Sequence, residues 1–92
     1  MSNRFLHIAF NWEGEPKIAE VKPVFDNALD WVRYAPNCWI VWTSSDPEKW
    51  YERLKPFLGE NDHMFICAVD VSVRNGWLPK KTWAWINKER AS

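Results

Sequence analysis

The clearest pattern in the chain is an alternation of apolar and other residues in two places. In FLHIAFNW, residues 5–12, Leu6 and every second residue after it are large and apolar, which predicts a strand with one strongly apolar face. HMFICAVDVSV, residues 63–73, also alternates but is apolar on both faces through its middle. This second strand is therefore expected to be central in a sheet or covered.

A helix is predicted after the turn at residues 13–16. Apolar residues recur at near-helical spacing from Ile18 to Ala28, and Pro16 suits a first helical position. Pro23 lies inside this pattern, where a proline removes one backbone hydrogen bond and clashes with the preceding turn. We therefore expect either a kinked helix or one that begins only at Pro23.

Two β-rich runs follow, DWVRYAP and NCWIVWTS, and they meet at Pro36-Asn37. Such a pair is typical of a tight turn, which predicts an antiparallel hairpin. An alternative stays open, because Leu29 and Val32 also continue the apolar stripe of the preceding helix. In that case the helix would extend through Tyr34.

A second helix is predicted behind SDPE, residues 45–48. This sequence matches a capping box, in which the Ser45 side chain accepts from the backbone N–H of Glu48 while Glu48 reaches back. The apolar stripe of this helix begins at Trp50, and Pro56 with Gly59 should end it.

The predicted order is β-α-β-β-α-β, with a short C-terminal helix that starts at Pro79. This is the order of the ferredoxin-like, split βαβ fold, an α+β domain with a four-stranded antiparallel sheet and two helices on one face. Residues 1–92 are too few for a second domain. The other face stays open, so we expect a homodimer or another partner to cover it. His7 and Asn11 should lie near its rim.

Composition adds an excess of tryptophan, with eight in 92 residues. Tryptophan carries a large apolar surface and an N–H that needs a partner when buried, and it is enriched at protein interfaces. The spacing of Trp50 assigns it to the core. The residues expected to contact a partner are His7, Trp12, Trp42, Trp77 and Trp85.

Charge argues against general phosphate binding, because twelve basic and twelve acidic residues give a net charge of zero. Basic residues nevertheless concentrate after Val73. Together with tryptophan stacking they would form a nucleic-acid site, whereas the ordinary interpretation is a solvated helix face. The residues of this alternative site are Arg74, Lys80, Lys81 and Lys88.

The cysteines and histidines predict neither a metal site nor a cofactor. Cys38 and Cys67 are flanked by apolar residues and fit small core positions. His7 and His63 lack the spacing of paired metal ligands. The chain has no membrane-length apolar run and no stretch like a signal peptide, so we expect a cytoplasmic protein with reduced thiols and no membrane contact.

Four segments carry a resemblance to a known family: AFNWEG, WVRYAPNCWIVWTSS, ERLKPFLGENDHMFICAV and GWLPKKTWAWI. In these segments the chain resembles a family of small ferredoxin-fold proteins that are similar to the CRISPR adaptation endoribonuclease. The family includes stand-alone bacterial members. In the nuclease members an aromatic residue and then an aspartate follow the first strand, and the aspartate helps to hold a divalent metal at the dimer interface. Phe10 matches the aromatic residue, and Asn11 stands where that aspartate would be.

The amide of Asn11 argues against metal-dependent hydrolysis, because Mg²⁺ strongly prefers anionic oxygens. The expected function is therefore a non-catalytic homodimeric binding module with a protein or nucleoprotein partner. Its small size also fits an inhibitor encoded by a phage or mobile element. The alternatives are nucleic-acid binding and a metal-dependent nuclease, which would need other carboxylates, with Glu13 and Asp70 as candidates.

Overall fold

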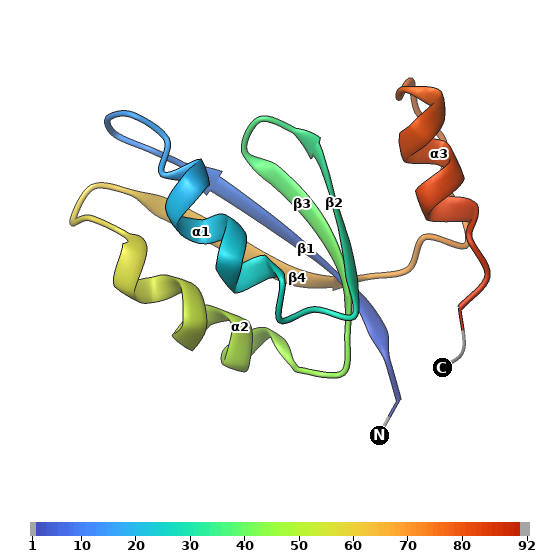
Figure 1. Cartoon of the computed structure of the whole chain (residues 1–92), viewed down its shortest axis with the longest axis horizontal. Coiled ribbons are helices and arrows are strands. Elements are labelled where there is room, and N and C mark those ends of the chain that lie inside the picture. Colours follow the sequence, from blue (N-terminus) through green and yellow to red (C-terminus); the bar gives the residue numbers. More distant parts are fainter. Residues whose placement is uncertain (1, 91–92) are drawn as a thin grey trace.

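The computed structural model describes residues 2–90. It contains four strands, three α-helices and a short 3-10 helix that directly follows the second α-helix (Figure 1). In chain order these are β1 (Arg4–Asn11), α1 (Ile18–Phe25), β2 (Asp30–Ala35), β3 (Cys38–Thr43), α2 (Pro47–Leu54), η1 (Lys55–Phe57), β4 (His63–Val69) and α3 (Lys80–Asn87).

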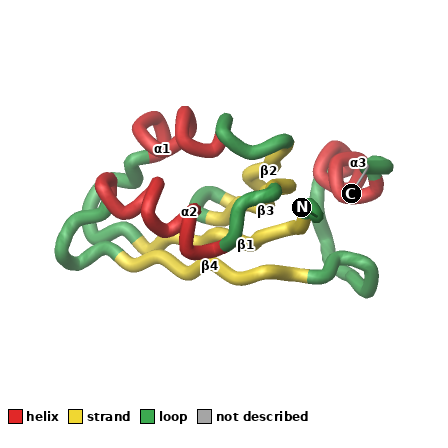
Figure 2. The backbone as a smooth tube through the Cα atoms, turned by 90° about the horizontal axis from the view of Figure 1, so that it is seen from below, coloured by secondary structure: helices red, strands yellow, loops and turns green. Residues whose placement is uncertain are grey.

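The strands form one antiparallel sheet in the order β2-β3-β1-β4. β1 and β3 are the inner strands, whereas β2 and β4 lie at the edges of the sheet formed by residues 2–90. Figure 2 shows α1 and α2 together on one face of the sheet, with α3 apart from them at one end. The fold is therefore α+β, and α3 contacts the sheet along β2.

The core lies between the sheet and α1 with α2. The predicted alternation of β1 is confirmed, because Leu6, Ile8 and Phe10 are buried beneath the helices. The ring of Phe25 is stacked between those of Trp39 and Trp50, with centroid distances of 4.6 and 5.8 Å. The indole N–H of Trp50 donates to Thr43 Oγ1 at 3.1 Å, so the predicted core position of Trp50 is also confirmed.

α1 begins at Ile18 and contains Pro23, so the prediction that the helix starts only at Pro23 is wrong. The helix starts earlier because Val21 and Phe25 bury their side chains against the sheet. The hairpin of β2 and β3 is confirmed, and the alternative of a helix through Tyr34 is wrong. The backbone N–H of Leu29 donates to the Trp42 carbonyl at 2.9 Å, which joins this segment to the sheet.

The N-cap of α2 is Asp46, so the predicted cap at Ser45 is wrong by one residue. Asp46 Oδ1 accepts the backbone N–H of Lys49 at 2.9 Å. The reason is Pro47, because a residue before proline is forced into the extended region and cannot join the helix. Asp46 has φ −85° and ψ 172° accordingly, which is the conformation of an N-cap.

β4 ends at Val69 and lies at a sheet edge, so the prediction of a central or covered strand is wrong. Its apolar residues on the helix side, among them Met64 and Ile66, pack against the core, while the opposite face is uncovered. The strand stops because Asp70 Oδ1 accepts the backbone N–H of Ser72 at 2.9 Å, a local turn that replaces strand pairing.

Candidate functional site

The sheet face opposite α1 and α2 carries two of the five predicted partner residues, His7 and Trp42. Because Leu6, Ile8 and Phe10 point to the helices, the alternating positions of β1 and of its paired neighbours point to the other side. We call this surface the open face. It consists of Phe5, His7, Ala9, Tyr34, Cys38, Ile40, Trp42, Phe65, Cys67 and Val69.

Most of the open face is apolar, and Phe65 leaves 64% of its surface exposed. Cys38 and Cys67 lie on it as half-buried free thiols on either side of β1. Their predicted positions in the core are therefore wrong, because their strands turn the alternate residues, such as Trp39 and Ile66, toward the helices.

A polar pair interrupts the apolar surface. His7 Nε2 and Tyr34 Oη share a hydrogen bond across β3. Burial lowers the pKa of His7. Burial, with the hydrogen bond and charge of the neighbouring Cys38, raises the pKa of Tyr34 to about 12. Both side chains are therefore neutral at neutral pH, and the centre of the open face carries no charge.

The C-terminal segment covers one end of the open face. Phe5 packs on Trp42 with ring centroids 4.6 Å apart and on Trp85 of α3 at 5.9 Å. The Arg90 guanidinium lies 4.3 Å from the centroid of the Trp85 ring and 5.2 Å from that of Phe5. Trp42 and Trp85 are thus parts of an internal aromatic cluster and only partly available to a partner.

Asp30 of β2 anchors this segment through ion pairs with Lys88 at 3.3 Å and Arg90 at 3.6 Å. Burial alone would raise the pKa of Asp30, but the nearby Trp85 indole, hydrogen bonds from Lys88 and the Trp31 backbone N–H, and the charge of Lys88 lower it. The carboxylate is therefore held ionised, which favours docking of the segment.

Asn11 and Glu13 lie at the far end of β1. Asn11 is exposed and pairs with His63 of β4. The Glu13 carboxylate accepts from Asn61 Nδ2 at 3.0 Å, and its backbone N–H donates to Asp62 Oδ1 at 2.8 Å. Asp62, which the sequence did not single out, also accepts the Gly59 N–H at 2.7 Å. These two backbone hydrogen bonds lower the pKa of Asp62. Through them Asp62 joins the loop after β1 to the loop before β4.

The candidate carboxylates of a nuclease are not brought together. Glu13 is hydrogen-bonded to Asp62, which lies just before the first residue of β4, whereas Asp70 lies just after its last residue. The seven residues of β4 therefore separate Glu13 from Asp70 by roughly 20 Å. Within residues 2–90, no three His, Cys, Asp or Glu side chains are close enough to hold a metal ion.

The remaining predicted residues are scattered. Trp12 is buried and stacked on Phe10 at 4.7 Å, so it offers little surface. Trp77 is fully exposed in the segment between β4 and α3. In the predicted basic site, Arg74 bonds to Asn87 and to the Val71 carbonyl, and Lys88 pairs with Asp30. Lys80 and Lys81 begin α3 and are exposed.

Of the residues of the open face, sequence reasoning singled out only His7 and Trp42 as partner contacts and missed the others, among them Tyr34, Phe65 and Cys67. The alternation of residues 63–73 carried the signal for Phe65 and Cys67, since it already placed them on one face. Tyr34 had no such signal, because the pairing of β2 with β3 is irregular between Arg33 and Ala35.

The described helices are all too short or too polar to cross a bilayer. Comparison of the chain with protein-family models, with curated proteins and with solved structures found no match. The functional interpretation therefore rests on the geometry of the open face and of its surroundings.

Proposed function

We propose that this chain is a non-catalytic binding module that forms a homodimer through the open face and engages a protein or nucleoprotein partner. The apolar surface of the open face carries the proposal, above all the exposed Phe65 and the half-buried Ile40 and Val69. A contiguous apolar surface of this kind marks an interaction site. A second copy can cover it with the same residues by twofold symmetry.

A ferredoxin-like fold is part of the proposal. In both crossover connections, β1-α1-β2 and β3-α2-β4, another strand lies between the two that are joined. This arrangement supports the split βαβ interpretation. It is also what the resemblance to the CRISPR adaptation endoribonuclease family implies. That resemblance, a cytoplasmic location and an origin in a phage or mobile element stay predictions.

The absence of catalysis is inferred from the end of β1. Asn11 offers an amide where the family has a metal-binding aspartate, and Mg²⁺ prefers anionic oxygens. The carboxylate of Glu13 is engaged by Asn61, and Asp70 lies at the opposite end of β4. A nuclease would need such groups close together in one cleft.

Sedimentation equilibrium tests the homodimer. We expect the wild-type chain of 11.0 kDa to sediment as a dimer. Phe65→Glu should weaken dimerisation by at least about tenfold, because it places a charge in the apolar interface. Leu29→Glu is the matched control, since Leu29 is 63% exposed but lies outside the open face. A monomeric wild type, or equal effects of both substitutions, would overturn the proposal.

A further inference from the structure

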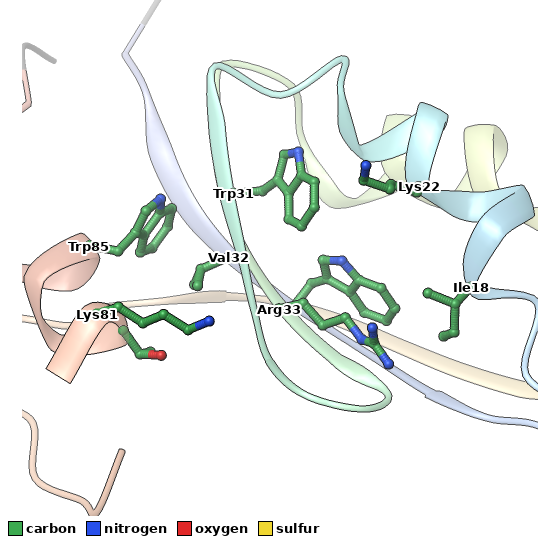
Figure 3. Close-up of a pocket in the computed structure, with 9 residues that line it drawn as sticks. Ile18, Lys22, Trp31, Val32, Arg33, Lys81 and Trp85 are labelled. Atoms are coloured by element: carbon green, nitrogen blue, oxygen red, sulfur yellow. The ribbon is translucent and has the colours of Figure 1, made fainter. Parts of the chain in front are cut away.

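A second concave surface lies beside β2, away from the centre of the open face. It is a groove of about 420 Å³ between α1, β2 and α3 (Figure 3), a volume in the range of ligand-binding sites. The residues that line it are Ile18, Lys22, Trp31, Val32, Arg33, Trp39, Lys81, Thr82 and Trp85.

The groove follows the free edge of β2. Trp31, Val32 and Arg33 are consecutive residues of this strand and point alternately to its two sides, so a cavity that touches all three runs along the edge. Figure 3 shows Lys22 on the α1 side of the strand and Lys81 on the α3 side. Within residues 2–90, β2 pairs with β3 alone. One edge of its backbone therefore faces the groove, with the Trp31 N–H on β2 already donated to Asp30 Oδ1 at 2.9 Å and the other groups of that edge left to pair.

The charge of the groove is positive. Lys22, Arg33 and Lys81 are exposed, and none of them forms an ion pair with a carboxylate of the described chain. No acidic residue among positions 2–90 lines the groove. The two nearby aspartates are already engaged, since Asp26 accepts the Trp31 indole N–H at 3.1 Å and Asp30, the first residue of β2, binds the C-terminal segment.

Tryptophan supplies the apolar part of the lining. Trp39 is almost fully buried, and its indole N–H has no hydrogen-bond partner within residues 2–90. A buried donor without an acceptor is costly.

The tryptophan rings do not favour nucleic acid as the occupant of the groove. Trp39 stacks on Phe25 at 4.6 Å and is almost inaccessible, and Trp31 is tilted against the same ring at 6.2 Å. The Arg90 guanidinium lies over Trp85 at 4.3 Å. Binding of single strands relies on exposed rings on which bases stack, and these rings already pack against other groups. A peptide needs instead a free strand edge and pockets for alternate side chains.

We propose that this groove binds an extended acidic peptide segment of a partner protein, which adds to β2 as a further strand. The backbone of the peptide pairs with the edge of β2, and its carboxylates pair with Lys22, Arg33 and Lys81. The inference goes beyond the homodimer, because the groove is a separate concave surface that adjoins the open face along β2 and at Trp85, which packs on Phe5. Either one can be absent while the other holds.

Fluorescence anisotropy with labelled peptides tests the inference on the full chain. The probe is an eight-residue peptide of alternating valine and glutamate, compared with its valine-lysine counterpart and with a version N-methylated at every second residue. We expect only the unmethylated acidic peptide to bind. The double variant Lys22→Glu, Lys81→Glu should bind it at least about tenfold more weakly. The matched control Lys49→Glu, Lys55→Glu makes the same charge change on α2 and η1 and should bind as the wild type does.

Circular dichroism of both double variants confirms that they are folded, and sedimentation shows that their self-association is unchanged. The proposal is overturned if the acidic peptide fails to bind or if the lysine peptide binds equally well. Equal binding of the N-methylated peptide would show that charge attraction alone, and not strand addition, holds the peptide. That result would also overturn the proposal. Tighter binding of a thymidine oligonucleotide, lost in the Lys22→Glu, Lys81→Glu variant, would assign the groove to nucleic acid instead.

Discussion

Single residues decide where the elements of this protein begin and end. Asp46 caps α2 because Pro47 keeps it extended, and Asp70 ends β4 by binding the Ser72 N–H. Asp62 joins the two loops at the far end of β1 by accepting the backbone N–H groups of Glu13 and Gly59. Each of these aspartates uses its side chain in place of a backbone acceptor.

The stability of α2 should depend on its cap at Asp46. Asp46→Ala should lower the free energy of unfolding by about 1 kcal/mol, because the N–H of Lys49 loses its acceptor. Ser45→Ala is the control, since the Ser45 side chain does not cap the helix in the described structure. Urea denaturation followed by far-ultraviolet circular dichroism measures both. A larger loss from Ser45→Ala would show that the capping box at Ser45 forms instead.

The elements show what can be predicted from the sequence and what cannot. Strand β1 and the hairpin follow from local periodicity and from proline positions, and both are confirmed, whereas α3 begins one residue after the predicted start, at Lys80, with Pro79 as its N-cap. The edge position of β4 could not be predicted from its sequence. A strand that is apolar on both faces has the same residue pattern whether its own chain covers the second face or leaves it open. The groove could not be predicted either, since Lys22, Arg33 and Lys81 come from three separate elements.

The docking of α3 should depend more on Arg90 than on Lys88. The Arg90 side chain is only 7% exposed and lies on Trp85 and Phe5, whereas Lys88, which pairs with the same Asp30, is 62% exposed. Arg90→Ala should therefore cost about 1–3 kcal/mol of α3 docking, and Lys88→Ala less than about 1 kcal/mol. Hydrogen exchange of α3 amides should accelerate in the first variant only. Equal protection of α3 in both would contradict this role of Arg90.

At the scale of the whole molecule, two different surfaces meet along β2. The open face is apolar and uncharged at its centre, whereas the groove is lined by tryptophan and three cations. A dimer that uses the first surface leaves the second free to bind a peptide. One copy of the chain could therefore hold a second copy and an acidic partner at once.

Self-association should depend on pH through His7. Burial lowers its pKa, so the neutral form is favoured in the folded chain. Stability from the neutral ring is present above its usual pKa of about 6.5 and is lost as the pH falls through the lowered value. Dimerisation should weaken over the same window, because a second copy would bury the charged ring further.

Sedimentation at neutral and mildly acidic pH measures this dependence. His7→Gln should remove most of it, whereas the exposed His63, changed to Gln as the control, should leave it intact. A pH dependence that survives His7→Gln would show that another group is responsible.

The position of β1 has a consequence for synthesis on the ribosome. β1 is an inner strand, and both of its neighbours, β3 and β4, are made after it. Its second edge stays unpaired until His63–Val69 has left the exit tunnel. Pairing between distant segments is slow, and an unpaired strand edge is prone to aggregate. The nascent chain therefore carries an apolar strand with an unpaired edge until β4 is available, and a chaperone that binds during this interval would protect it from aggregation.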